Sequence, residues 1–175
     1  MSTPTARGAR GAAQGILADD RTQQREAIID GLKKAYWMEI ETVMSYIASS
    51  VNPDGVRAQE IIESLQEDIQ EELGHAQRFA TRIKELYGVV PGSKEFVAEQ
   101  DALQPPEHQT DVVHVIKGVI EAETGAIEHY NALIELTDGV DPVTNDMVID
   151  ILRDEEGHRR LFEGFLREYK LEGLA

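Results

Sequence analysis

Four stretches of the chain carry apolar residues at alternating steps of three and four, which is the spacing of one face of an α-helix. These stretches cover about residues 20–50, 56–87, 110–137 and 141–169. An apolar face of this length is stable only when it packs against other helices. The pattern therefore predicts an all-α, four-helix bundle that occupies residues 20–175 as one domain.

Turn residues mark the helix ends and leave one long connection. Residues 52–55 form a predicted short turn between the first two helices, and Gly88 is expected to end the second helix. Residues 88–110 are then long enough to cross the bundle from end to end, so helices two and three are expected to run parallel. Within this crossover, Ser93 is a candidate N-cap for a short helix that ends near Leu103.

The composition narrows the classes of function. The 175 residues include no cysteine, which excludes iron–sulfur clusters, rubredoxin-type iron and disulfides. No apolar run approaches the roughly 20 residues of a membrane span, and no secretory signal is evident, so a cytoplasmic protein without a membrane partner is expected. The net charge of −16 disfavours direct binding to nucleic acid. Residues 1–19, whose basic side chains are Arg7 and Arg10 alone, are predicted to be a flexible tail.

Each predicted helix places a carboxylate where its apolar row requires a core residue. These core-facing carboxylates are Glu39, Glu72, Glu123 and Glu155. Their acidic neighbours Glu41 and Glu121 fall on faces with polar residues, where solvation is a sufficient explanation. The spacing thus selects Glu39 over Glu41 and Glu123 over Glu121.

The second and fourth helices share the motif Glu-x-x-His, from Glu72 to His75 and from Glu155 to His158. The spacing of three residues directs both side chains of a motif toward one point. Each motif follows the core-facing glutamate of the preceding helix by 33 or 32 residues, so the chain has two similar halves. One such motif is common on helix surfaces, whereas two in register with core glutamates predict a two-metal centre.

Buried carboxylates need compensation, because each ionised group would lose several kcal/mol of hydration. Divalent cations relieve both this cost and the mutual repulsion. The predicted metal ligands and catalytic residues are Glu39, Glu72, His75, Glu123, Glu155 and His158. Mixed carboxylate and imidazole donors suit iron, manganese or zinc, and six ligands for two ions leave coordination positions open for small molecules.

Two tyrosines, Tyr46 and Tyr130, lie on the core-facing rows two turns beyond a glutamate. Their matched placement suggests that each hydroxyl holds the glutamate of the opposite half-site. The other histidines, His108, His114 and His129, fall on loops or polar faces and are interpreted as surface residues. Trp37 is interpreted as a packing residue between helices or subunits.

This arrangement of glutamates and Glu-x-x-His motifs resembles the ferritin-like di-iron carboxylate proteins. Within that group, residues 146–162 are especially similar to the fourth helix of bacterioferritin, and residues 20–170 resemble bacterioferritin and bacterioferritin-like members of the Dps-like family. The resemblance implies two iron ions per subunit, with manganese or zinc as alternatives. It implies that one ion is held by Glu39 with His75 and the other by Glu123 with His158, while Glu72 and Glu155 bridge the two.

The resemblance also implies a function. Bacterioferritin-like proteins are ferroxidases that oxidise Fe(II) with O2 or H2O2, store Fe(III) in a hollow homo-oligomer and protect against oxidative stress. Bacterioferritin binds haem through a methionine directly after the glutamate of helix two, and Leu73 stands there in this chain, so no haem is expected. The chain has no room for a fifth helix after the fourth, so a cage of twelve subunits is an alternative to one of twenty-four.

Other functions remain open at the level of the sequence. A di-iron or di-manganese enzyme that stores nothing, such as a catalase, a peroxidase or an oxygenase, would have the same ligands. A DNA-protecting protein of the nucleoid is disfavoured by the charge. The physiological metal, the oxidant, the number of subunits and residence inside another compartment are not fixed by the residues.

Overall fold

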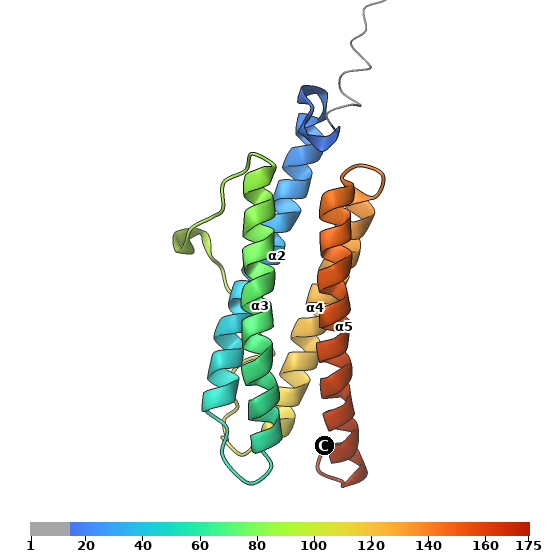
Figure 1. The fold of residues 1–175 in the computed structure, drawn as a ribbon. Helices are drawn as coiled ribbons and strands as arrows, with labels where there is room; N and C mark the ends of the chain where they lie inside the picture. The colour runs from blue at the N-terminus through green and yellow to red at the C-terminus, as the bar shows by residue number, and fades with distance from the viewer. Residues whose placement is uncertain (1–14) are drawn as a thin grey trace, which may run out of the picture.

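Four long α-helices form the protein in the computed structural model, which describes residues 15–175 (Figure 1). The helices are α2 (Thr22–Val51), α3 (Gln59–Glu85), α4 (Val112–Thr137) and α5 (Pro142–Leu171). Three 3-10 turns accompany them: η1 (Gly15–Leu17), η2 (Asp19–Arg21) and η3 (Ser93–Glu95). Over the described part of the chain there is no strand, which confirms the all-α prediction. None of these helices is long and apolar enough to cross a membrane.

The helices form two antiparallel pairs. α2 packs mainly on α3, and α4 packs mainly on α5. Between the pairs, α3 and α4 run in the same direction, since the connection from the end of α3 returns along the bundle before α4 begins (Figure 1). The predicted single long crossover between the second and third helices is therefore confirmed.

The prediction of a short helix from Ser93 to Leu103 is wrong beyond its first turn. Only Ser93–Glu95 is helical, as a 3-10 turn. The amides of Glu99 and Gln100 donate to the carboxylate of Glu41 on α2 instead of to carbonyls of their own segment. These amides are satisfied without a helical ladder, so the crossover stays extended.

Helix α3 ends at a different residue from the one predicted. Tyr87, and not Gly88, adopts the left-handed backbone conformation, with φ +67°. The amide of Gly88 then donates to the carbonyl of Ile83 at 2.9 Å, which closes the last turn. Gly88 is needed for another reason: a Cβ there would lie 2.9 Å from the Ile83 side chain and 3.0 Å from that of Ile29.

Of the predicted tail at residues 1–19, residues 1–14 lie outside the described residues. The remainder packs on the bundle: Ile16 is buried in the core, and Ala18 is 1% exposed. Arg25 of α2 donates to the carbonyls of Ile16 and Ala18, both at 3.1 Å. Within residues 15–175, packing against the bundle thus begins at Ile16, before the predicted boundary.

The apolar core is divided into two clusters along the bundle. One cluster contains Leu32 and Phe79, and the other contains Leu65 and Phe162. On each helix the core-facing glutamate lies between residues of the two clusters; on α3, for example, Glu72 follows Leu65 and precedes Phe79. The carboxylates therefore form a polar layer in the middle of an otherwise apolar bundle.

Candidate metal centre

All six sequence-predicted ligands lie in this polar layer. Their exposed fractions are Glu39 2%, Glu72 0%, His75 4%, Glu123 2%, Glu155 1% and His158 7%. α2 and α4 supply one glutamate each, and α3 and α5 each supply a glutamate and, one turn later, a histidine. The helical spacing of three residues places both motif side chains on the face that meets the opposite helix pair.

The six residues fall into two overlapping groups of possible ligands. Glu39 and His75 belong to one group and Glu123 and His158 to the other, while Glu72 and Glu155 belong to both. Within each group, one ligand atom per residue lies within 4.8 Å of the others. Two neighbouring positions that share two carboxylates are the geometry expected of a bridged pair of ions.

Each imidazole faces the shared glutamates with its Nδ1 atom. His75 Nδ1 lies 3.1 Å from Glu155 Oε1 and 3.5 Å from Glu72 Oε2. His158 Nδ1 lies 3.2 Å from Glu72 Oε1 and 3.8 Å from Glu155 Oε2. The shortest of these contacts in each half crosses between α3 and α5, so both helices enclose each position.

Several ligand atoms in this layer are buried and have no hydrogen-bond partner among the described residues. They are Glu72 Oε1, Glu72 Oε2, His75 Nδ1, Glu155 Oε1 and His158 Nδ1. A buried polar atom left unpaired destabilises a fold, and such atoms are rare in native proteins. These five atoms lie close together but are not aligned for hydrogen bonds with one another. Cations shared among them would compensate for their burial.

Two tyrosine hydroxyls support the outer glutamates. Tyr46 donates a hydrogen bond to Glu123 Oε1, and Tyr130 donates one to Glu39 Oε1. Each bond joins α2 and α4, and each tyrosine is completely buried. The hydroxyls fix the orientation of the two carboxylates while leaving a second oxygen of each available to a metal.

Burial and mutual repulsion alter the acidity of the layer. Burial, and then repulsion by Glu155 and Glu72, raise the pKa of Glu39 and of Glu123 well above its usual range. Burial would lower the pKa of His75, but Glu155 and Glu72 outweigh burial and raise it to about 10. For His158 the same balance raises the pKa to about 12. The metal-free layer therefore retains protons that metal ions would displace.

Burial would also raise the pKa of Glu72. Its contacts with Glu39, His158 and His75 outweigh burial and lower this pKa below the usual range of a glutamate. A lowered pKa favours the ionised form of Glu72, which is in contact with both imidazoles. A carboxylate with a lowered pKa at the centre of the group is suited to hold two cations at once.

The outer nitrogens of the two histidines reveal residues that the sequence reasoning missed. His75 Nε2 lies 3.3 Å from Asp154 Oδ2 of α5, and His158 Nε2 lies 2.9 Å from Glu71 Oε2 of α3. Such partners fix the ring orientation of a metal-binding histidine. A signal was present in the sequence, since Glu71 and Asp154 each directly precede the glutamate of a Glu-x-x-His motif.

The interpretation of Glu41 as a solvated residue is wrong. It is 6% exposed, and its Oε1 accepts hydrogen bonds from the amides of Glu99 and Gln100, each at 2.8 Å. The crossover covers this face of α2, which the helical pattern of α2 alone does not reveal. Glu121, the other carboxylate that the spacing rejected, is exposed as expected.

Of the histidines interpreted as surface residues, His129 is only partly exposed. Its Nε2 lies 2.9 Å from the carbonyl oxygen of Gly31, and burial lowers its pKa. Trp37 packs against the rings of Tyr36 and Phe96 at centroid distances of 5.0 and 5.2 Å. The Trp37 contacts lie between α2 and the crossover.

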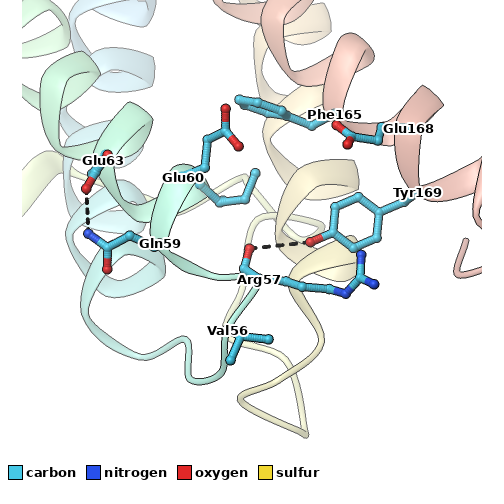
Figure 2. Close-up of a pocket in the computed structure, with 9 residues that line it drawn as sticks. Val56, Arg57, Gln59, Glu60, Glu63, Phe165, Glu168 and Tyr169 are labelled. Atoms are coloured by element: carbon cyan, nitrogen blue, oxygen red, sulfur yellow. Dashed lines mark hydrogen bonds between the residues drawn. The ribbon is translucent and has the colours of Figure 1, made fainter.

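A surface pocket of about 450 Å³ lies at one end of the bundle, away from the carboxylate layer (Figure 2). It is lined by the turn before α3, the start of α3 and the end of α5, where the Tyr169 hydroxyl donates to the carbonyl of Arg57 at 3.4 Å. The Arg57 guanidinium pairs with Glu172. None of the predicted ligands lines this pocket, so it is separate from the candidate centre.

The sequence matches the ferritin-like domain over residues 29–171. The chain belongs to the ferritin-like family. It is 29% identical over 145 residues to the "DNA protection during starvation protein" of Pyrococcus furiosus. The aligned region covers 81% of this chain and 77% of that protein. It is 25% identical over 148 residues to the bacterioferritin of Desulfovibrio desulfuricans. The aligned region covers 84% of this chain and 78% of that bacterioferritin.

Solved structures agree with this assignment. The bacterioferritin-related protein of Bacteroides fragilis, described as a dodecameric thioferritin, superposes with a TM-score of 0.73 at 25% identity. The match covers 85% of this chain and 89% of that one. The predicted resemblance to bacterioferritin and Dps-like proteins is thereby confirmed.

Proposed function

We propose that this ferritin-like protein is a ferroxidase that oxidises Fe(II) at the carboxylate layer and stores Fe(III) inside an oligomeric cage. The observation that carries the proposal is the set of five buried, unpartnered ligand atoms contributed by Glu72, His75, Glu155 and His158. Four carboxylates and two imidazoles suit Fe(II), which accepts both oxygen and nitrogen donors. Manganese and zinc fit the same donors and are alternatives.

Two metal positions are assigned from the two overlapping groups. Glu39 and His75 would hold one ion and Glu123 and His158 the other, while Glu72 and Glu155 belong to both groups and would be shared between the ions. Tyr130 and Tyr46 orient Glu39 and Glu123 through their hydrogen bonds. All six ligands come from one chain, so the centre is complete within a subunit.

Two Fe(II) ions bound side by side would supply two electrons to one oxidant molecule. Two Fe(II) ions lose one electron each and become Fe(III). With two protons, these electrons convert O2 to H2O2, or H2O2 to two molecules of water. The residues of the chain hold both ions in a buried layer, so that one oxidant takes both electrons and no radical is released. Asp154 and Glu71 hold the outer nitrogens of the two imidazoles and so keep each Nδ1 directed inward.

Storage and assembly are supported by the relatives. The Bacteroides fragilis protein is described as dodecameric, and the Pyrococcus furiosus protein is named for DNA protection. For this chain we propose a cage of twelve or twenty-four subunits without haem, because Leu73 replaces the methionine that would bind it. Any protective effect on DNA would come from removing Fe(II) and oxidant, since a net charge of −16 disfavours contact with phosphates.

Size-exclusion mass together with aerobic iron loading tests the storage function. We expect a large homo-oligomer that takes up far more than two iron ions per chain, with the added Fe(III) retained in the protein fraction. A dimer or tetramer that stops at two ions per chain would instead identify a redox enzyme of the same fold that stores nothing.

Replacing Glu72 tests the assignment of the centre. Glu72→Ala removes the carboxylate shared by both positions, so rapid oxidation of Fe(II) should be abolished in stopped-flow absorbance measurements. Glu121→Ala is the matched control, because Glu121 is an exposed glutamate of α4 outside the layer. If Glu72→Ala and Glu121→Ala both oxidise Fe(II) at the unmodified rate, the centre is misassigned.

A further inference from the structure

The edge between α3 and α5, called here the α3–α5 seam, is held differently from the rest of the bundle. Each helix pair is closely packed within itself, and the two pairs approach each other along α2 and α4, whereas α3 and α5 come close at few points. One groove, of about 450 Å³, lies at the start of α3 and the end of α5 (Figure 2). A second groove, of about 520 Å³, lies between the later part of α3 and the start of α5. The outer side of the seam is therefore loosely packed at both ends.

Charged and polar pairs cross the seam along its length, in the order expected of two antiparallel helices. The pairs are Arg57 with Glu172, Glu71 with His158, His75 with Asp154, Arg78 with Asp150, and Arg82 with Asp141. The three arginine pairs contain no predicted metal ligand. They can therefore hold the seam whether or not the centre contains metal.

The arginine pairs differ in strength along the seam. The Arg82 guanidinium donates to both carboxylate oxygens of Asp141, at 2.8 and 2.9 Å, and to the Thr144 hydroxyl at 2.8 Å, and Asp141 is 1% exposed. In the Arg78 and Arg57 pairs, each side chain is at least 37% exposed. Exposed pairs are weak and screened by salt, whereas a buried two-pronged pair holds its geometry. The seam is thus fixed at the Arg82 end and weakly held toward the Arg57 end.

The candidate metal centre connects the same two helix pairs. Both groups of ligands contain residues of α3 and of α5, and both include Glu72 of α3 and Glu155 of α5. Ions shared by these two carboxylates would join α3 to α5 in the middle of the bundle. Because a ligand stabilises the state that binds it, a filled centre would favour the closed seam.

We infer that the α3–α5 seam is a latch, hinged at Arg82 and Asp141, that opens from the Arg57 end and is closed by metal bound at the dinuclear centre. The inference rests on the proposed function for the presence of ions at the centre, but not on the oxidation or storage of iron. When the latch opens, α3 and α5 separate on the side of the groove in Figure 2, and their ligand side chains become accessible. The rate of metal exchange then depends on how readily the seam opens.

A covalent link across the groove in Figure 2 tests the opening. Glu60 of α3 and Glu168 of α5 are exposed and line this groove, and the chain has no cysteine of its own. The whole protein carrying Glu60→Cys and Glu168→Cys is treated with a bismaleimide, which links the two helices, or with N-ethylmaleimide, which modifies both thiols without linking them. We expect the linked form to bind Co(II), and to release it to EDTA, several-fold more slowly than the unlinked form. Denaturing electrophoresis confirms that the link lies within one chain.

The same link at the other end of the seam is the control for position. Gln77 of α3 and Asp146 of α5 are exposed and line the second groove, which Arg82 also lines. Because the seam is already fixed there, linking Gln77→Cys to Asp146→Cys should leave the Co(II) rates close to those of the form treated with N-ethylmaleimide. Equal slowing by both links would overturn the assignment of the hinge.

Weakening an arginine pair tests the latch in the opposite direction. Arg78→Gln removes a pair that crosses the seam and should speed the release of Co(II) to EDTA several-fold at low salt. Arg153→Gln is the matched control, because Arg153 contacts the same Asp150 at 2.9 Å but from α5 itself. Added salt should speed release from the unmodified protein, and less so from Arg78→Gln. Circular dichroism of each variant confirms that the helices are intact.

Two results would overturn the latch. Equal Co(II) rates in the linked and unlinked forms of Glu60→Cys with Glu168→Cys would show that metal exchanges without opening of the seam. Equal release from Arg78→Gln and Arg153→Gln would show that the pair across the seam does not hold it. Since the experiment involves no oxidation, a protein whose Co(II) exchange is slowed by the link, but which fails to oxidise Fe(II), would refute the proposed function and keep the latch.

Discussion

At the scale of residues, the centre depends on carboxylates whose orientation is fixed by a few hydrogen bonds. One oxygen of Glu39 on α2 accepts a hydrogen bond from Tyr130 on α4. One oxygen of Glu123 on α4 accepts a hydrogen bond from Tyr46 on α2. The tyrosine ring also fills space in the apolar cluster on its side of the layer. Each tyrosine therefore both packs in the core and orients a carboxylate. A substitution by phenylalanine keeps the ring and removes the hydroxyl, so it tests the two roles separately.

Tyr46→Phe should leave the fold intact and weaken the metal position held by Glu123. Outer-shell partners of metal ligands typically contribute about 10- to 100-fold in affinity or activity. We expect a loss in this range for Co(II) affinity at one of the two inner positions, measured by absorption titration. Tyr130→Phe should weaken the other position by a similar factor. Full affinity in both variants would mean that the tyrosines only fill the core.

At the scale of elements, Glu41 ties the crossover to α2. Its carboxylate accepts hydrogen bonds from the amides of Glu99 and Gln100 at 2.8–3.0 Å, and Gln100 Nε2 donates to Thr42 at 2.7 Å. These contacts hold the crossover along α2 between η3 and the start of α4. Since hydrogen bonds to charged groups are stronger than neutral ones, we expect Glu41 to contribute strongly to holding this segment on α2.

Glu41→Ala should loosen the crossover while leaving the four helices and the inner centre in place. We expect a loss of about 1.5–3 kcal/mol in the local stability of residues 96–103, the range for a hydrogen bond to a charged group. Hydrogen exchange of the Glu99 and Gln100 amides measures it directly. Glu121→Ala, at an exposed position of α4, should not change their exchange. Unchanged protection in Glu41→Ala would show that packing alone holds the segment.

At the scale of the whole molecule, the bundle has a layer of buried carboxylates and imidazoles in its middle, and we expect cations to stabilise it. Without metal, protons take that role: the pKa values of Glu39 and Glu123 lie well above the usual range, and those of His75 and His158 rise to about 10 and about 12. Metal ligands must lose these protons before they bind. Proton and metal therefore compete for the same buried atoms.

Metal binding should accordingly tighten as the pH rises. The metal-free folded state carries extra protons on Glu39, Glu123, His75 and His158, and the metal-bound state does not, so a higher pH favours the bound form. The rise in thermal midpoint on adding excess Zn(II) should be larger at about pH 7.5 than at about pH 5.5. Calorimetric titration in buffers of different ionisation enthalpy should show proton release. A shift in midpoint that is independent of pH would contradict the assigned protonation.

The sequence by itself determined the type of fold and the six residues that share the buried polar layer. Periodicity identified four helices and chose Glu39 over Glu41 and Glu123 over Glu121, because a side chain's place on a helix follows from local spacing. The two Glu-x-x-His motifs indicated that the four carboxylates meet. The prediction from spacing was wrong for Glu41, because the sequence around a helical residue does not indicate whether a distant segment covers its face of the helix.

Only the tertiary structure decided which atoms meet across the bundle. It paired Tyr46 with Glu123 and placed Asp154 beside His75, both between helices far apart in the chain. It also showed that Asp68 is buried beside His158 with its Oδ2 unpaired among residues 15–175, whereas Ile151 stands at the corresponding position of the other half. Local spacing fixes the direction of a side chain from its own helix, whereas the contact it makes depends on how four helices pack, and that is a property of the assembled bundle.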